Sequence, residues 1–343
     1  MVPNAKCGLR RLHPSSALKG LESAKALTCL SVSESDALSD FSAMAGMRSL
    51  QRFPGRGYSG DRIDLSSFLA LNDIGFVSGL KAATSIELKL VGHVDLSPLS
   101  GLPQLNSVNL ELDTLDQDFS PLAGQRELVL ALIDPKTGYR LSPTGKTKAG
   151  HKYVWSGQFP HLEKLEVSGG EHDLAQWQAP YLISFESWSR MPTLRGVGHA
   201  KEIKFQIQHC DSLEGLSGSP IESLDVYYND ADVKSLPSVK VFHELPGLKT
   251  LRIGSGLSVR HAKELVGCRQ IQVLQTSSFR GSLAFLAGWE SLTRLDLRNS
   301  GELTDLETLC QLPSLVEIRL RGSSMKRDIW PKALQDRLDF MSS

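Results

Sequence analysis

Several features that would mark a secreted, membrane-spanning or catalytic protein are scarce or missing in this 343-residue chain. The opening residues, MVPNAKCGLRRLHPSS, carry charges and prolines where a signal peptide needs an apolar stretch. No apolar run is long enough to predict a membrane span. The five cysteines are odd in number and widely scattered, which is typical of reduced thiols rather than a disulfide framework. These absences predict a cytoplasmic protein that does not enter a membrane.

Neither positive nor negative charge is in excess, and the common catalytic motifs are missing. The chain has 38 basic and 38 acidic residues, so it lacks the uniform basic field of a non-specific nucleic-acid binder. The GKT at 145–147 lacks the earlier glycine of a phosphate loop, and no G-x-S-x-G, H-E-x-x-H or C-x-x-C occurs. His172 and His209 are expected at the solvent edge of strands. We therefore predict no enzyme activity, catalytic residue, metal site, cofactor or small-molecule substrate.

Leucine, in contrast, is abundant, and its positions are regular. The chain contains 54 leucines. From Leu283 the apolar residues recur every third position to Leu295, and a step of two then reaches Leu297. A step of three fits neither an α-helix nor a strand, whereas the final step of two is strand-like. One unit therefore contains a turning segment whose apolar residues face inward, followed by a short strand.

The strand element, with the pattern leucine-x-x-leucine-x-leucine, recurs along the chain. Complete copies close at Val32, Leu110, Val167, Val226, Ile253, Thr276, Leu297 and Leu320, and weaker copies are read at Leu88/Leu90, Leu130/Leu132 and Phe205/Ile207. Between 180 and 210, Leu182/Phe185 is taken as a strand, with Leu194/Val197 as a competing register. The segments LPQL, FPHL, LPGL and LPSL each place a proline two residues before a strand. The spacing of the apolar residues, the length of the unit and the proline-containing segment before the strand therefore repeat together.

Residues 18–322 resemble leucine-rich repeats of 20–23 residues, the type found in bacterial internalin-like proteins. The resemblance implies an α/β fold, a curved horseshoe-shaped solenoid with a parallel β-sheet on its concave face. Short helices, 3₁₀ turns and loops would form the convex face. The asparagine that the family places after each strand appears only at Asn229, and other copies hold residues such as Asp113 or Ser300. We expect other side chains to accept hydrogen bonds from the turn amides.

The repeat pattern sets the domain boundaries. Residues 1–17 are a thin N-terminal cover, 18–322 are the solenoid, and 323–343 are a C-terminal cap in which Trp330, Leu334 and Leu338 would close the last coil. An insertion at about 134–158 interrupts the rhythm. Its basic and aromatic residues could bind nucleic acid, although a solvated hairpin is favoured; they are Lys136, Tyr139, Arg140, Lys146, Lys148, His151, Lys152, Tyr153 and Trp155.

The strand residues between the leucines point away from the core, onto the concave sheet. The expected central column contains Lys89, Ala131 and Gln206 in the weaker copies. Acidic residues, two aromatics and several arginines stand at the other outward positions, and aromatics and arginines are the usual anchors of protein interfaces. The candidate partner-binding residues are Glu166, Glu186, Trp188, Asp225, Tyr227, Arg252, Arg294, Asp296, Arg298, Arg319 and Arg321.

The sequence therefore predicts a non-enzymatic module that binds another protein on its concave sheet. One alternative is the substrate-recognition part of an enzyme or effector complex whose catalytic domain lies elsewhere. The second alternative, nucleic-acid binding through 134–158, is disfavoured.

Overall fold

The computed structural model describes residues 6–9, 18, 20, 21, 23–32, 40–53, 63–65, 70–134, 139, 141, 151–227, 237–254, 257–322 and 325–339. They form two compact units, a division that the sequence did not indicate. Unit 1 comprises the residues up to His172 together with Gln176–Tyr181, and unit 2 comprises Asp173–Ala175 and the residues from Leu182 onward.

Unit 1 is a stack of coils built around a parallel sheet. The sheet has the order β3-β4-β5-β6-β8, and a separate pair, β1-β2, is also parallel. The elements are β1 (Lys6–Leu9), β2 (Cys29–Val32), η1 (Ser42–Gly46), β3 (Ile63–Asp64), η2 (Gly75–Gly79), β4 (Ser85–Leu90), α1 (Ser97–Ser100), β5 (Ser107–Leu112), η3 (Ser120–Leu122), β6 (Glu127–Leu132), β7 (Lys152–Gln158) and β8 (Lys164–Gln178), where η denotes a 3₁₀ helix.

Unit 2 repeats this plan. Its sheet has the order β9-β10-β11-β12-β13-β15-β17-β18, all parallel, and β14 pairs with β16. The elements are β9 (Ser184–Arg190), η4 (Arg195–Val197), β10 (Glu202–Gln206), η5 (Ile207–His209), η6 (Glu214–Leu216), β11 (Ser223–Tyr227), η8 (Lys240–Glu244), β12 (Thr250–Gly254), α2 (Val259–Glu264), β13 (Val273–Ser277), β14 (Gly281–Ser282), η9 (Leu283–Leu286), β15 (Arg294–Arg298), β16 (Leu303–Thr304), η10 (Leu306–Gln311), β17 (Glu317–Arg319), η11 (Arg327–Ile329), η12 (Lys332–Arg337) and β18 (Leu338–Asp339).

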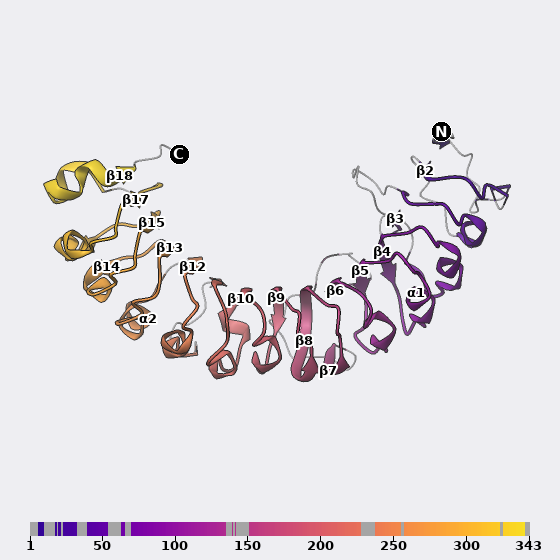
Figure 1. Ribbon diagram of the computed structural model, residues 1–343, viewed down its shortest axis with the longest axis horizontal. Coiled ribbons are helices and arrows are strands. Elements are labelled where there is room, and N and C mark those ends of the chain that lie inside the picture. The colour runs from indigo at the N-terminus through magenta and orange to yellow at the C-terminus, as the bar shows by residue number, and fades with distance from the viewer. Residues whose placement is uncertain are drawn as a thin grey trace. The chain divides into compact units, whose positions relative to one another are not determined.

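The leucine repeat forms the core between the strands and the helical turns. Within each unit the strands of the long sheet lie on one side and the short helices on the opposite side (Figure 1). In β4 and β5 every second residue is buried, which leaves the alternate side chains on the strand face. The step-three residues are buried as expected: Leu283, Leu286, Trp289, Leu292 and Leu295 are inaccessible to solvent. Each buried aliphatic stabilises the fold by about 1.5–3 kcal/mol. The fold is a leucine-rich-repeat solenoid.

Polar side chains accept hydrogen bonds from the turn amides in place of the missing asparagines. Asp113 accepts a hydrogen bond from the backbone N–H of Gly92 at 2.8 Å. Gln117 accepts one from Val94 at 2.9 Å, and the Ser300 hydroxyl accepts one from Phe279 at 3.1 Å. Substitute acceptors are therefore present, as the sequence predicted. Asn229 lies outside the described residues.

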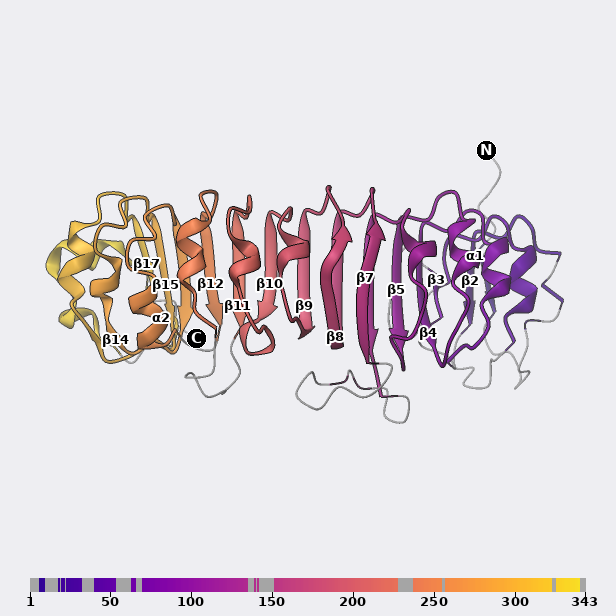
Figure 2. The same cartoon turned by 90° about the horizontal axis from the view of Figure 1, so that it is seen from below.

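The segment expected as an insertion contains the strand β7, which lies off the strand order of the main sheet. The N–H of Glu171 donates to His151 O, and the N–H of Phe159 donates to Gln178 O, so β7 runs parallel to the second half of β8. Figure 2 shows β7 and β8 side by side. Gly169 and Gly170, with φ of 77° and 69°, separate the halves of β8. A Cβ at Gly170 would lie 2.6 Å from His151 O, so this turn requires glycine.

Candidate functional site

The strand face of unit 2, defined by the outward side chains of β9 to β17, carries most of the candidate residues. The backbone register aligns one outward residue of each strand into a central column across the sheet. This column consists of Glu186, Lys204, Asp225, Arg252, Gln275, Asp296 and Arg319. Charge alternates along its first four members.

The predicted register was wrong by two residues in the three weaker copies. Lys204 stands beside Glu186 and Asp225, where the sequence placed Gln206. In unit 1, Glu87 and Val129 flank Asn109, in the places expected for Lys89 and Ala131. A shift of two keeps the same residues outward but changes which strands' side chains are neighbours. Lys204 is the residue of the site that the sequence analysis missed.

Trp188 and Tyr227 form an aromatic pair on this face. Their ring centroids are 5.2 Å apart with an interplanar angle of 53°. Both side chains are half-buried rather than fully exposed. Tyr227 lies against Gly254 of the next strand, where a Cβ would come within 2.9 Å of the tyrosine ring. The absent side chain at Gly254 therefore makes room for the Tyr227 ring.

Lys204 connects the aromatic pair to Glu186. Its Nζ lies 5.0 Å from the Trp188 ring centroid and 5.6 Å from that of Tyr227. The same Nζ donates to Glu186 Oε1 at 2.8 Å, and the Trp188 indole N–H donates to that oxygen at 2.6 Å. Cation–π attraction and a charge-assisted hydrogen bond thus hold the two rings in place.

The electrostatic surroundings keep Lys204 charged. Partial burial opposes the charge, but the hydrogen bond and charge of Glu186, with further contributions from Tyr227 and Asp225, outweigh it and raise the Lys204 pKa. The ammonium group is therefore a permanent part of the site at neutral pH.

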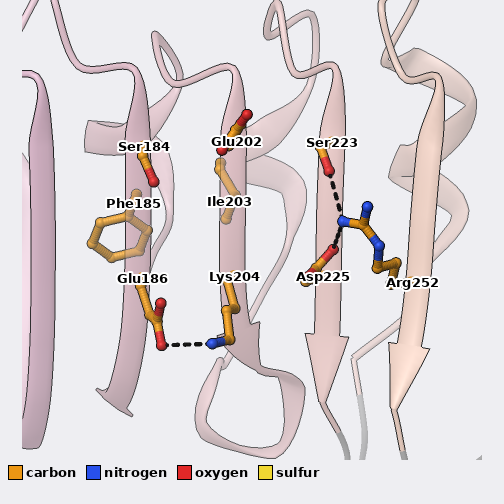
Figure 3. Close-up of a pocket in the computed structure, with 9 residues that line it drawn as sticks. All are labelled: Ser184, Phe185, Glu186, Glu202, Ile203, Lys204, Ser223, Asp225 and Arg252. Atoms are coloured by element: carbon orange, nitrogen blue, oxygen red, sulfur yellow. Dashed lines mark hydrogen bonds and ion pairs between the residues drawn. The ribbon is translucent and has the colours of Figure 1, made fainter.

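A shallow hollow lies between the Glu186–Lys204 pair and a second ion pair. Arg252 Nη1 donates to Asp225 Oδ1 at 2.9 Å and to the Ser223 hydroxyl at 3.3 Å. Figure 3 shows these side chains around the hollow, whose volume is about 150 Å³. Ligand sites for drug-sized molecules are usually about 300–1,000 Å³. The hollow is therefore smaller than the usual site of a drug-sized molecule.

The remaining candidate residues of unit 2 cluster on β15 and β17. Glu317 accepts hydrogen bonds from Arg294 Nε at 2.5 Å and from Arg319 Nε at 2.6 Å. Burial opposes its charge, but these arginines outweigh that effect and lower the Glu317 pKa. Asp296 is buried and accepts from Arg298 Nε at 3.4 Å and Nη2 at 3.3 Å. Arg321 follows β17 and is half-buried.

Three residues singled out in the sequence remain: Glu166, His172 and His209. Glu166 lies in unit 1, opposite Val129. His172 and His209 were expected at the solvent edge, and this was wrong because both are buried. Desolvation lowers the pKa of both imidazoles, that of His172 to about 4. Both histidines therefore belong to the interior.

In the described part of the basic–aromatic segment, Trp155 belongs to the core and Tyr139 is exposed. Trp155 is fully buried, and its ring centroid lies 5.9 Å from Phe119, 5.5 Å from Phe159 and 5.4 Å from Trp177. Lys152 forms an ion pair with Glu171 at 2.9 Å. Lys136, Arg140, Lys146 and Lys148 lie outside the described residues.

Metal-ligand clusters and the buried thiol of Cys268 were the remaining features to consider in the described part of the chain. No cluster of three or more His, Cys, Asp or Glu side chains there could hold a metal ion. Burial raises the Cys268 pKa to about 12, so its thiolate is scarce at neutral pH. None of the described helices is both long and apolar enough to cross a membrane.

Comparison with known proteins identifies the fold. No protein-family description and no curated protein matches the sequence. Among solved structures, an internalin (InlF) from Listeria monocytogenes matches with a TM-score of 0.51 and 17% identity, over 94% of this chain and 89% of that one. A leucine-rich-repeat protein of Leptospira interrogans matches with a TM-score of 0.41 and 14% identity, over 95% and 93% of the two chains. By fold, the chain is a leucine-rich-repeat protein similar to internalins.

Proposed function

We propose that this protein is a non-enzymatic recognition module that binds another protein on the strand face of unit 2. The observation that carries the proposal is the Trp188–Tyr227 pair, with Lys204 Nζ within 5.6 Å of both ring centroids. Aromatic side chains fixed in one orientation lose little entropy on binding, and they are frequent hot spots of protein interfaces.

The chemistry of the surrounding face favours a protein partner over other ligands. Acidic and basic side chains alternate across the sheet, and they form two ion pairs, Glu186–Lys204 and Asp225–Arg252. Each pair is neutral by itself. Alternating charge fixes the register of a folded or extended polypeptide but repels a continuous polyanion. The small hollow beside these pairs suits one side chain rather than a whole metabolite.

The likeness of fold supports the class of function without identifying the partner. We place the interaction in the cytoplasm, on the evidence of the scattered cysteines. The recognition subunit of an enzyme or effector complex is a special case of the same proposal. It differs only in whether the captured partner has a catalytic domain.

Site-specific crosslinking with matched variants tests the proposal. A photoreactive amino acid at Gln206, on the strand between those of Trp188 and Tyr227, should crosslink a partner protein in host lysate. The double variant Trp188→Ala, Tyr227→Ala should reduce capture by at least tenfold. Tyr227→Phe, which keeps the ring, should retain it. Arg260→Gln, which removes the Arg260–Glu264 ion pair of α2, is the matched control and should bind as wild type.

A partner retained equally by the double variant, with its fold verified by circular dichroism, would contradict the proposed site. It would move binding to another surface of the protein.

A further inference from the structure

The hollow drawn in Figure 3 carries a chemical requirement for the partner. We infer that it receives one basic side chain, a lysine or an arginine, of the protein partner, and that Glu202 is the carboxylate that chiefly pairs with it. This inference rests on the proposed function, because it concerns the same partner and the same strand face.

Glu202 lines the hollow without a partner of its own. The charged side chains that line the hollow are Glu186, Glu202, Lys204, Asp225 and Arg252. Four of them form the two ion pairs, at 2.8 and 2.9 Å. Among the residues that the structure describes, none forms a hydrogen bond or an ion pair with the Glu202 carboxylate. The hollow therefore holds one negative charge that the described residues leave unpaired.

Polar groups around Glu202 can complete the contacts of a cationic group. The register places the hydroxyl-bearing residues Ser184 and Ser223 beside Glu202 on the two adjacent strands. Glu186 and Asp225 use Oε1 and Oδ1 in their ion pairs, and the second oxygen of each accepts no hydrogen bond from the described residues. An ammonium group has three N–H donors and a guanidinium five, and these donors need acceptors when they leave water. The lining supplies them.

Two lysines lie near Glu202 but pair with another acid. Glu222 forms ion pairs with Lys201 at 3.7 Å and with Lys249 at 3.1 Å. The hydrogen bond and charge of Lys249, with the charge of Lys201, lower the Glu222 pKa. Neither lysine lines the hollow. Because two lysines share one carboxylate there, the net charge of this part of the face is balanced, and recognition of a cation depends on direct contact within the hollow.

A basic side chain suits the hollow better than a metal ion, a metabolite or an acidic side chain. In the described part of the chain, no three His, Cys, Asp or Glu side chains are placed to hold a metal ion. The volume of about 150 Å³ is below the usual range of ligand sites. A partner carboxylate would meet the like charge of Glu202, whereas an ammonium or guanidinium group would form a charge-assisted hydrogen bond with it.

The register also fixes how far Glu202 lies from the aromatic pair. Gln206 is beside Tyr227, and Glu202 is four residues before Gln206 on β10. Four residues of a strand span about 13 Å. A partner segment that runs along the strands in an extended conformation would therefore place its basic residue about four positions from the apolar residue that contacts the aromatic pair.

A display library of random twelve-residue peptides, selected on the full chain, tests this chemistry. Wild type should enrich peptides that combine an aromatic or aliphatic residue with lysine or arginine. A selected peptide should bind Glu202→Gln about tenfold more weakly than wild type. Replacing the basic residue of the peptide by Gln should weaken binding to wild type by the same factor and change binding to the variant little. Glu290→Gln makes the same change of charge at an exposed residue outside the hollow, so it is the matched control and should bind as wild type.

The outcomes separate the inference from the proposed function. Enrichment of apolar residues without lysine or arginine, or with acids instead, would overturn the inference and leave the aromatic anchor. Basic peptides that bind Glu202→Gln as tightly as wild type would also overturn it, since the cation would then be bound elsewhere. Basic peptides that depend on Glu202 but bind the Trp188→Ala, Tyr227→Ala variant unchanged would support the hollow and overturn the aromatic anchor. No enrichment would overturn both.

Discussion

At the residue scale, His172 is a buried imidazole that the fold holds in its neutral form. Its Nδ1 accepts the indole N–H of Trp155 at 3.2 Å, and its Nε2 lies 3.3 Å from the carbonyl oxygen of Gly169. Both contacts are satisfied only when the proton is on Nε2. Protonation of Nδ1 would place a hydrogen against the indole donor. Desolvation, opposed by the Gly169 contact, accordingly lowers the His172 pKa to about 4.

This lowered pKa predicts a loss of stability in mild acid. Because the unfolded chain takes up the proton near pH 6.5 and the folded chain only near pH 4, the free energy of unfolding should fall as the pH falls through that window. The full effect is about 3 kcal/mol. Urea unfolding followed by circular dichroism at pH 7, 6, 5 and 4.5 measures it.

His172→Phe provides the comparison, because other groups titrate equally in both proteins. The unfolding free energy of wild type minus that of the variant should fall by about 1.4 kcal/mol for each pH unit between 6.5 and 4. A difference that is constant with pH would show that His172 is not the responsible group.

At the element scale, aromatic packing holds β7 in place outside the main sheet. Trp155 points into the coil, where it packs against Phe119, Phe159 and Trp177, whereas Val154 points outward and is 44% exposed. Trp155→Ala should therefore destabilise the protein by about 3–5 kcal/mol, since it leaves a cavity and removes the donor to His172.

Val154→Ala, the adjacent control, should change the unfolding free energy by less than about 0.5 kcal/mol. Both values come from urea denaturation at pH 7. Equal effects of the two substitutions would mean that β7 does not pack as described.

The leucine pattern predicted the repeat elements because apolar spacing and burial coincide in most coils. The predicted strand register was wrong by two residues in the copies whose first apolar position holds a small or polar residue. Ala83, Gln125 and Ala200 occupy that position and are buried. Lys204 was missed for this reason, since the first clear aliphatic of its copy lies inside the strand. β7 was missed because its partners in the aromatic cluster come from segments that no local pattern connects to it.

At the scale of the whole molecule, each coil buries its apolar residues against its neighbours, so an end coil needs a cover. The sequence predicted the anchors of the C-terminal cap, and the structure shows Trp330 and Leu334 buried in the segment where β18 pairs with β17. The two-unit division, in contrast, has no signal in the repeat pattern. Stability should therefore depend on residues that join coils more than on residues at the surface.

The C-terminal cap gives a direct test of this dependence. Trp330 is 2% exposed, and the neighbouring Ile329 is 52% exposed. Trp330→Ala should lower the unfolding free energy by about 3–5 kcal/mol and expose the apolar edge of the last coil, so that the variant also self-associates in size-exclusion chromatography. Ile329→Ala should remain monodisperse and within about 0.5 kcal/mol of wild type. If Trp330→Ala were as stable as Ile329→Ala, the last coil would not need this cover, and stability would reside in the coils further from the end.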